Sequence, residues 1–534
     1  MSILKTNHLY IFGALICFLG LQSCSGSSGS STCSLGSGSN ITVSGKATFD
    51  RVALQSSGSL DFNNITQQPV KGAVVEAICN GILTSTNTDA DGNYSLTIPG
   101  NTTGVFIRVK AQLLKTGTPS WDVSVSDETQ AAKLIFSMDG SAFNTTSANL
   151  IRNLNAISGW NGVNYEAVRA AAPFAILDTI YDAMQTVLAE NANTQFPLLD
   201  VKWSATSTSG TFYSSITKTI SVLGRTTDTD EFDEHVIAHE WGHYFQDAFS
   251  RDDSIGGPHS SSDVLDMRVA FSEGFGNAFS AIVTGDAIYK DSQGLSAGFT
   301  INIESNNCVV NAVEGWFSEC SVQSVLYDFF DVTDDGADDL SLGFSPMYTV
   351  LTANMPNTDA LTSIFSFITP FKAVAGNVGS IDNLLLTDHS IATISNDEGT
   401  GRLLNPGSTD QTPVFETAFN IPSMCLTGEN GGYNGLGVTR FVQFTVNTSG
   451  SYTFAAVKLS GGLTSTDPDI VIRSKGQLIG VGESTLNNSE TLSVNLITGV
   501  IYTLELSEFA TYGNPDYTPS GGSTDTTCFS LTRS

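Results

Sequence analysis

The spacing of the apolar residues changes twice along this chain of 534 residues, and the change limits the folds that the sequence can adopt. Between residues 41 and 115 apolar and polar side chains alternate, which is the period of a strand with one buried face. From about residue 155 the apolar residues recur at helical spacing, and after about residue 420 the alternation returns. Because the chain is longer than one hydrophobic core usually serves, we expect about three domains, all-β at both ends and α+β in the middle.

The N-terminal residues 1–23 have the pattern of an export signal. Lys5 and His8 precede an apolar run that is short for a membrane span but suits a signal peptide. The sequence LQSC that ends in Cys24 resembles the cleavage box of bacterial lipoproteins. The resemblance implies a lipid anchor on Cys24 that holds the protein in the bacterial cell envelope, at the outer membrane or cell surface; an ordinary signal peptide cut nearby is the alternative. Residues 24–40 are rich in Ser and Gly and are expected to form a flexible tether.

The cysteines also indicate export. Of the eight, Cys17 leaves with the signal and Cys24 takes the lipid, so six remain, and an even number in an exported chain suggests disulfides. The sequence does not fix the pairing. Proximity in the sequence favours a bond between Cys308 and Cys320. A bond between Cys425 and Cys528 would bracket the last segment, which leaves Cys33 to pair with Cys79.

The formal charge of −30 limits the partners of the chain. Nucleic acids are bound by clustered Lys and Arg, and anionic lipids attract basic patches, so neither is expected as a partner through charge. The charge is instead typical of a soluble, self-repelling surface.

Two short patterns in the first β-rich segment resemble a known module. Val70–Val74 reads V-x-G-x-V, and Thr88–Tyr94 reads T-D-x-x-G-x-Y with a turn at its glycine. Both resemble the β-sandwich of carboxypeptidase regulatory domains, which implies an N-terminal β-sandwich over 41–150 that acts as a spacer or binding surface. Residues 419–534 resemble, more weakly, the C-terminal β-sandwich modules of secreted bacterial peptidases.

The middle segment, residues 151–418, mixes helices with strands. Two stretches read as strands, 198–204 and 210–224. Pro173 is expected to divide the first helical stretch, and acidic residues are expected in the first turn of the second. Helical spacing extends over four stretches: 165–191, 230–250, 264–285 and 320–331.

The second helical stretch contains AHEWGH, residues 238–243. His239 and His243 are four residues apart, so on a helix both rings project from one face and can reach one cation at about 2.1 Å. Glu240 follows the first histidine, where a carboxylate can accept a proton from water at the metal. This HExxH spacing predicts a zinc site with Glu240 as general base.

His235 lies on the same helix face and raises the question of which pair binds. The outer histidines, His235 and His243, are about 12 Å apart along a helix axis, which is too far for a shared zinc ion. With His235 and His239 as the pair, Val236 would stand where a base is needed. We therefore expect His239 and His243 as ligands and His235 as a supporting or surface residue.

The third ligand separates the families that share this spacing. A metzincin would continue to a glycine and a third histidine, but those positions hold Gln246 and Phe249. Glu273 stands in AFSEGFGNAFSAI, which resembles the ligand helix of gluzincins, with Asp266 as the rival ligand of an aspzincin-type site. The longer separation from His243 implies an inserted loop at 251–263.

The chain is thus similar to gluzincin-type zinc metallopeptidases over about residues 155–415. The resemblance implies an α+β zincin-like core between two all-β sandwiches, Zn²⁺ as cofactor and a protein or peptide as substrate. It also implies an edge strand that holds the substrate, for which 214–224 is placed, and a Tyr or His that stabilises the oxyanion. Tyr327 and His389 are the candidates for this last role, and the sequence does not choose between them.

Residues 331–339 contain spaced acidic residues around Gly336 and resemble a calcium loop, but they lack the glutamate that ends an EF-hand loop. An exposed acidic turn is the preferred interpretation.

For the whole chain, zinc-dependent peptide hydrolysis is the leading hypothesis. An adhesin or binding lipoprotein with an inactive peptidase-like core is the alternative, and a zinc-storing or zinc-sensing surface protein is the third.

Overall fold

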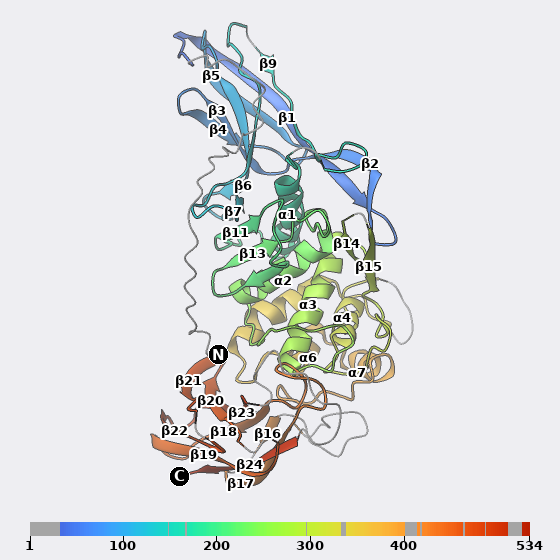
Figure 1. Cartoon of the computed structure of the whole chain (residues 1–534), viewed down its shortest axis with the longest axis vertical. Helices are drawn as coiled ribbons and strands as arrows, with labels where there is room; N and C mark the ends of the chain where they lie inside the picture. The colour runs from blue at the N-terminus through green and yellow to red at the C-terminus, as the bar shows by residue number, and fades with distance from the viewer. Residues whose placement is uncertain are drawn as a thin grey trace, which may run out of the picture.

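The fold is described here by a computed structural model covering residues 33–147, 149–165, 168–294, 296–332, 338–400, 414–416, 419–462, 465–485, 487–510 and 526–534. Figure 1 shows an elongated molecule with β-rich ends and its helices gathered in the middle. The expected signal peptide, Cys24 and residues 24–32 of the tether lie outside the described residues. The rest of the expected tether does not run free, because Cys33 is bonded to Cys79 and the first strand of the fold already begins at Gly38. Within the described residues, no helix is both long and apolar enough to cross a membrane.

The N-terminal end contains a sheet of five strands in which the long first strand pairs with four others. Alternation along the chain predicts this well, because Tyr94, Leu96 and Ile98 point inward from one strand while the residues between them are exposed. The five strands are β1 (Gly38–Leu54), β2 (Leu60–Pro69), β5 (Asn93–Gly100), β9 (Leu150–Ile151) and β10 (Leu154–Ala156).

A second sheet of eight strands runs across residue 150, where the sequence predicts a domain boundary. β7 pairs in parallel with β11, which places Val125 beside Val201, and both side chains are fully buried. Residues from both sides of the predicted boundary therefore share one hydrophobic core. The strands in sheet order are β12 (Phe212–Ser214), β13 (Thr219–Val222), β11 (Leu199–Trp203), β7 (Trp121–Asp127), β6 (Phe106–Lys115), β3 (Ala73–Ile78) and β4 (Ile82–Asn87), with β8 (Ser137–Asp139) on β6.

The strand at the edge of this sheet is not the one that the sequence suggests. β13 pairs on one side with β11 and on the other with β12, so its main-chain groups are used on both sides. Phe212–Ser214, the short strand β12, is the edge instead. The prediction that 214–224 forms the edge strand is therefore wrong, because the chain turns back after Ser214 and covers β13 with its own preceding residues.

Helices occupy the middle of the molecule (Figure 1). Pro173 stands in the first turn of α1, where a missing N–H costs nothing, so the helix begins there instead of being divided. α2 begins at Glu234, which gives its first turn an acidic residue as expected, although the helix starts four residues later than the predicted stretch. The helices are α1 (Ala172–Glu190), α2 (Glu234–Phe249), α3 (Met267–Thr284), α4 (Glu319–Asp328), α5 (Phe344–Thr349), η1 (Val350–Asn354), η2 (Met355–Asn357), α6 (Ile364–Ala375) and α7 (Val378–Thr387).

Two hairpin strands, β14 (Ile288–Gln293) and β15 (Ser296–Asn302), follow α3. α2 and α3 pack closely at two glycines, since a Cβ on Gly242 would lie 3.4 Å from Cα of Gly276. This close approach brings the side chains of the two helices together.

The C-terminal end is all-β and has a hydrophobic core of its own. Its two sheets have five and four strands. The first contains β16 (Val414–Glu416), β18 (Arg440–Phe444), β23 (Tyr502–Glu508), β20 (Pro468–Ser474) and β21 (Gln477–Gly482), and the second contains β17 (Ile421–Thr427), β24 (Thr526–Arg533), β19 (Gly450–Gly461) and β22 (Ser489–Leu496). The predicted boundary at 418 lies outside the described residues.

The six cysteines form the three disulfides that the sequence favours: Cys33–Cys79, Cys308–Cys320 and Cys425–Cys528. Their presence fits a protein that folds in an oxidising, exported compartment.

The calcium-like loop at 331–339 lies largely outside the described residues.

Candidate metal centre

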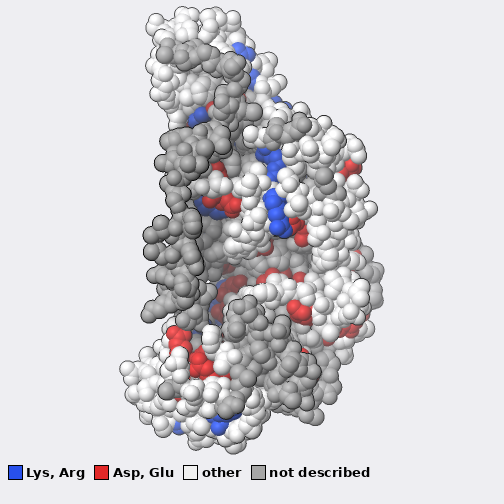
Figure 2. Space-filling view, viewed as in Figure 1, with Lys and Arg blue, Asp and Glu red and all other residues white. Residues whose placement is uncertain are grey.

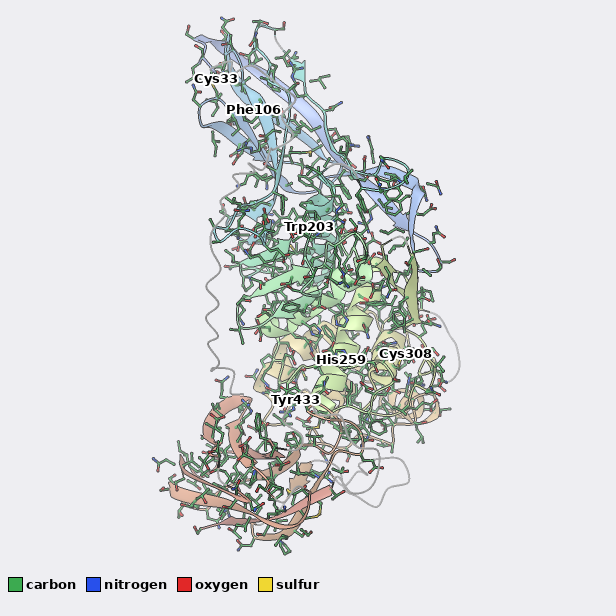
Figure 3. All side chains as sticks on the ribbon, in the orientation of Figure 1. Cys33, Phe106, Trp203, His259, Cys308 and Tyr433 are labelled. Carbon is green, nitrogen blue, oxygen red and sulfur yellow. A yellow bond between two sulfur atoms is a disulfide. The ribbon has the colours of Figure 1, made fainter. Side chains whose placement is uncertain are left out.

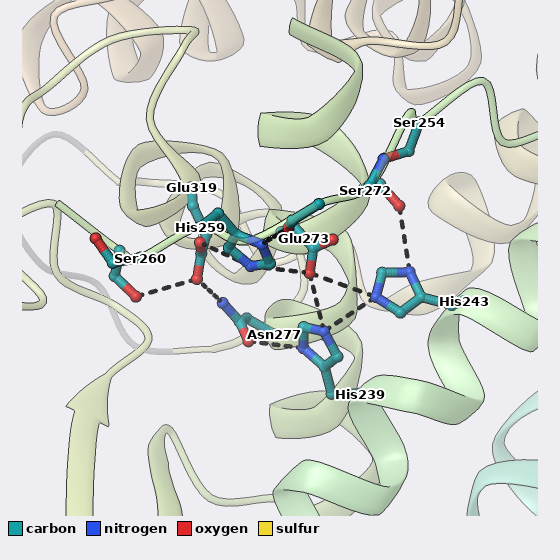
Figure 4. Close-up of polar contacts among 12 residues, drawn as sticks. His239, His243, Ser254, His259, Ser260, Ser272, Glu273, Asn277 and Glu319 are labelled. Carbon is teal, nitrogen blue, oxygen red and sulfur yellow. Dashed lines mark hydrogen bonds and ion pairs between the residues drawn. The ribbon is translucent and has the colours of Figure 1, made fainter. Parts of the chain in front are cut away.

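Helix α2 presents His239 and His243 from one face, as their spacing predicts. The two Nε2 atoms lie 3.0 Å apart, and α3 brings Glu273 to both, with its Oε2 at 3.2 Å from Nε2 of His239 and 3.5 Å from Nε2 of His243 (Figure 4). These three ligand atoms form a small triangle. The structure therefore brings together all three residues that the sequence selects as metal ligands.

The size of this triangle fits a tetrahedral zinc ion. Bonds of about 2.1 Å at tetrahedral angles place neighbouring ligand atoms about 3.4 Å apart. The observed separations of 3.0, 3.2 and 3.5 Å lie close to that value. Two imidazole nitrogens and one carboxylate oxygen are also a donor set that zinc accepts.

The outer hydrogen bonds fix which ring nitrogen of His239 faces the centre. Asn277 donates from its Nδ2 to Glu319, at 2.8 Å, and to Gln323, at 2.9 Å, so its Oδ1 is the acceptor. That Oδ1 lies 2.8 Å from Nδ1 of His239. Nδ1 therefore carries the hydrogen, and the lone pair of Nε2 points at the centre.

His243 is oriented in the same way from the other side. Ser272 donates its hydroxyl hydrogen to Asp252 at 2.9 Å, and its oxygen lies 3.2 Å from Nδ1 of His243. The hydroxyl oxygen then accepts from Nδ1, so Nε2 of His243 is the nitrogen that faces the centre, and a metal ion would bind its lone pair in place of a proton. Two imidazole nitrogens facing each other beside a carboxylate favour a cation between them.

The electrostatics of the centre agree with this orientation. Burial alone would lower the pKa of His243, but the Glu273 carboxylate outweighs it and raises the pKa to about 10. Burial alone would raise the pKa of Glu273, but the charge and hydrogen bonds of the histidines lower it well below its usual range. Glu273 is therefore ionised, and its field favours any cation at this point, whether a proton or a metal ion.

Glu240 lies beside both the centre and the edge strand. Its Oε2 accepts a hydrogen bond of 2.7 Å from the backbone N–H of Tyr213 in β12. Burial raises the pKa of Glu240, and the nearby histidines oppose this shift. The carboxylate is thus held in place by the main chain of the strand that forms the edge of the sheet.

His259 is a residue of the site that the sequence does not reveal. It comes from the loop at 251–263, and its Nε2 lies 3.4 Å from Oε2 of Glu273 and 3.7 Å from Oε2 of Glu319. Its side chain is 27% exposed, so it faces both the centre and the solvent. His259 lies in an irregular loop, where neither the spacing of apolar residues nor a sequence motif predicts a site residue. Only the fold brings it to Glu273.

The C-terminal part of the chain holds the loop that carries His259. Tyr433 donates from its hydroxyl to the carbonyl of Ile255, at 3.0 Å, and Asn434 donates to the carbonyl of Pro258, also at 3.0 Å. Figure 3 shows Tyr433 below His259, where the helical middle meets the C-terminal strands. The position of His259 therefore depends on residues more than a hundred positions later in the chain.

Tyr289 in β14 is a second residue that the sequence does not reveal. Its ring centre lies 5.2 Å from that of His235 and 6.4 Å from that of His239. Burial raises its pKa well above the usual range, and nearby carboxylates add to the shift, so the phenol keeps its hydrogen. His235 itself is buried and bonded to Ser280 at 3.1 Å, a supporting position rather than a metal ligand.

The remaining predicted site residues lie away from the centre. Tyr327 is at the end of α4, about 12 Å along the helix axis from Glu319 at its start. His389 is buried between Asn306 and Asp328, at 2.9 and 2.8 Å. Among the described contacts neither reaches the three clustered residues, because Tyr327 lies at the C-terminal end of α4 and His389 is bonded to Asp328 at that same end.

Asp266, the rival ligand, is engaged elsewhere. Its carboxylate caps α3 through the backbone N–H of Arg268 and pairs with the guanidinium of the same residue at 3.0 Å. A side chain with those partners is not free to turn toward the histidines. Of the two alternatives, Glu273 is the one that the fold brings to the centre.

Figure 2 shows acidic side chains gathered around the recessed middle of the molecule, at the height of the helices.

The sequence family described as Mycolysin C-terminal domain matches residues 185–362, a stretch that contains α2, α3 and the loop with His259. That family relates to secreted metallopeptidases, so the matched stretch, which is less than half of the chain, is peptidase-related.

The comparisons with other proteins are weaker. No curated protein matches the chain. The pre-peptidase C-terminal domain of collagenase from Bacillus anthracis is 13% identical, with coverage of 24% of this chain and 100% of that one and a TM-score of 0.16. The periplasmic inhibitor of g-type lysozyme from Aeromonas hydrophila is 15% identical, with coverage of 23% and 94% and a TM-score of 0.14. At these scores neither structure bears on the fold or the function of the chain.

Proposed function

We propose that the chain is an exported zinc-dependent peptidase of the gluzincin type. His239, His243 and Glu273 would hold the metal, and Glu240 would act as general base. The observation that carries the proposal is the convergence of two Nε2 atoms and one carboxylate oxygen within 3.5 Å, with both Nδ1 atoms tied to outer partners. The match to a domain of secreted metallopeptidases supports the same class.

The chemistry divides between the metal and the protein. When bound, zinc supplies Lewis-acid polarisation of the scissile carbonyl and lowers the pKa of a water molecule toward about 7. Glu240 accepts a proton from the attacking water and passes it to the leaving amine. The N–H of Tyr213 holds the carboxylate in position for both transfers. His259 would be the donor for the developing oxyanion in place of Tyr327 and His389, since its loop brings Nε2 beside the centre, 3.4 Å from Oε2 of Glu273.

The substrate would be an extended peptide that pairs with the edge strand β12. An edge strand offers unpaired main-chain groups, and a peptide that adds to it is read mainly through its backbone. β12 carries Tyr213 next to Glu240, so a peptide on this edge would lie beside the base. A lipid anchor on Cys24 would keep the enzyme in the cell envelope, and the three disulfides fit such an exported location.

Metal analysis and peptide digestion test this function together. The purified chain is expected to contain about one zinc ion and to cleave members of a peptide library. Phenanthroline should abolish cleavage, and added zinc should restore it. Zinc without cleavage would favour the zinc-storing alternative, and the absence of both would favour an adhesin with an inactive core.

Gly276 provides a sharper test of the ligand geometry. A Cβ at this position would lie 2.8 Å from Cε1 and Nδ1 of His239, so Gly276→Ala must displace the ring. We expect zinc affinity to fall about tenfold or more, as it does when the support of a metal-bound histidine is lost. Alanine favours the helix over glycine, so a weaker helix would not explain the loss.

Gly242→Ala is the matched control for this substitution. It is also a helical glycine at the contact of α2 and α3, but its Cβ meets the nearest atom at an ordinary 3.4 Å. Zinc affinity, measured by competition with a chromogenic chelator, should stay near that of the unsubstituted chain. Equal affinities in both variants would contradict the assignment of His239 as a ligand.

A further inference from the structure

A second acidic cluster lies just before α2, apart from the three residues of the candidate metal centre. Asp228, Asp230 and Asp291 each direct a carboxylate oxygen to one point, with all three oxygens within 4.8 Å of one another. The first two come from the loop between β13 and α2, and the third comes from β14. Residues about 60 positions apart in the chain are thus brought together by the fold.

Asp230 is the buried member of the cluster, with a relative exposure of 4%. Its Oδ2 accepts from Thr211, but its Oδ1 is buried and accepts no hydrogen bond from the described residues. Behind it, Asp233 is fully buried, and its Oδ1 also has no partner among the described residues. Buried carboxylate oxygens are costly unless a hydrogen bond or a cation satisfies them.

The side chains around the cluster do not supply that cation. Arg225 pairs with Asp228 at 2.9 Å, on the exposed side. Arg169 is bonded to Glu231 at 2.7 Å, and Lys290 pairs with Asp286. Within the described part of the chain, no Lys or Arg forms an ion pair with Asp230 or Asp291.

The titration of these groups reflects the same excess of negative charge. Burial, together with the neighbouring carboxylates, raises the pKa of Asp230 to about 8 and that of Asp291 to about 6. Burial and the same neighbours raise the pKa of Asp233 well above its usual range. Bringing three or four carboxyl groups together in this way is unfavourable unless protons or a metal ion are shared among them.

We propose that Asp228, Asp230 and Asp291 bind a calcium ion. The donors are all oxygen, without nitrogen or sulfur, which favours a hard cation over zinc. Asp228 and Asp291 are half-buried, so water can complete the six to eight ligands that calcium takes. An exported protein meets calcium at concentrations that fill sites with a Kd of about 10⁻⁴ to 10⁻³ M.

The ion would join the loop before α2 to the β14 strand. Asp233 already makes this connection in part, since its Oδ2 accepts from the backbone N–H and the hydroxyl of Ser292, at 2.8 and 2.9 Å. β14 also carries Tyr289, whose ring lies next to His235 and His239. Calcium at this point would therefore hold β14 against the start of the helix that carries both histidines, and it would act on stability rather than on the reaction.

Calcium titration of the full chain tests the proposal independently of peptidase activity. The protein is first depleted with a calcium-selective chelator, with zinc kept in the buffer. We expect calcium to bind with a Kd in the range given above and to raise Tm by about 2 °C or more at saturation, with magnesium having a smaller effect. An unchanged Tm together with no calorimetric signal for calcium would overturn the proposal and would indicate that protons are shared among the aspartates instead.

Asp291→Asn is the variant that tests the ligands. It removes one charge from a half-buried position, so the fold should tolerate it, and calcium affinity is expected to fall about tenfold or more. Asp286→Asn is the control, because that residue precedes the same strand but pairs with Lys290 outside the cluster. Calcium binding by Asp291→Asn that equals binding by Asp286→Asn would rule out the assigned site.

Discussion

Replacing Glu240 by glutamine is expected to leave zinc bound and to lower peptide hydrolysis by about 10²- to 10⁴-fold. The amide keeps the size of the carboxylate and can still accept the hydrogen bond from the N–H of Tyr213. It cannot take a proton from water. The metal ligands are other residues, so zinc content should not change. The measurement is kcat/KM on a cleaved peptide, with zinc determined on the same sample.

Glu234→Gln is the matched control for this prediction. The residue is in the first turn of the same helix, 46% of its side chain is exposed, and it pairs with Arg51 instead of facing the metal centre. This variant should cleave at a rate close to that of the unsubstituted chain. If Glu240→Gln cleaves as fast as Glu234→Gln, Glu240 is not the base. That result would not contradict the assignment of the metal ligands.

The parts of this site that the sequence predicts are those that a helix fixes locally. The spacing of His239 and His243 needs only the helical repeat, and the apolar neighbours of Glu273 place it on a buried helix. Asn277 is one turn further along α3 and follows from the same repeat once the ligand is known. A buried carboxylate and a histidine pair need each other, so their meeting could be predicted without the fold.

The parts that the sequence does not predict depend on contacts between distant segments. His259 reaches Glu273 only because Tyr433 and Asn434 hold its loop, and no local pattern reveals that contact. Tyr327 and His389 are chosen by analogy with a family, and analogy does not say that both lie at the C-terminal end of α4, away from Glu319.

The strand pairing in the eight-stranded sheet also depends on contacts between distant segments and cannot be predicted from the sequence. β11 is predicted as a strand and β7 lies within the predicted N-terminal β-sandwich, but their parallel pairing joins Val125 to Val201 across a helix and many loops. A parallel pair needs such a long connection, so the hydrophobic pattern of either strand cannot reveal its partner. The predicted boundary at residue 150 follows from a change of period, and a change of period does not exclude a shared sheet.

The second large effect is expected at Arg268, which joins the helix of Glu273 to the C-terminal sheets. Only 2% of its side chain is exposed, and it pairs with Asp266 and Glu505, each at 3.0 Å, and lies over the ring of Phe441. Arg268→Met keeps most of the volume but leaves two buried carboxylates without this partner. We expect the free energy of unfolding to fall by about 3 to 5 kcal/mol, because removing one member of a buried ion pair leaves an uncompensated charge.

Arg473→Met separates this effect from a general loss of charge. Arg473 pairs with the same Glu505 at 2.6 Å, but its side chain is 31% exposed, so the loss should be about 1 kcal/mol or less. Denaturant unfolding measures both variants. Arg268 is in the first turn of α3, so zinc affinity should fall in Arg268→Met and stay unchanged in Arg473→Met. Equal losses of stability in the two variants would show that burial of Arg268 does not set its contribution, and that the C-terminal sheets do not hold the ligand helix through this residue.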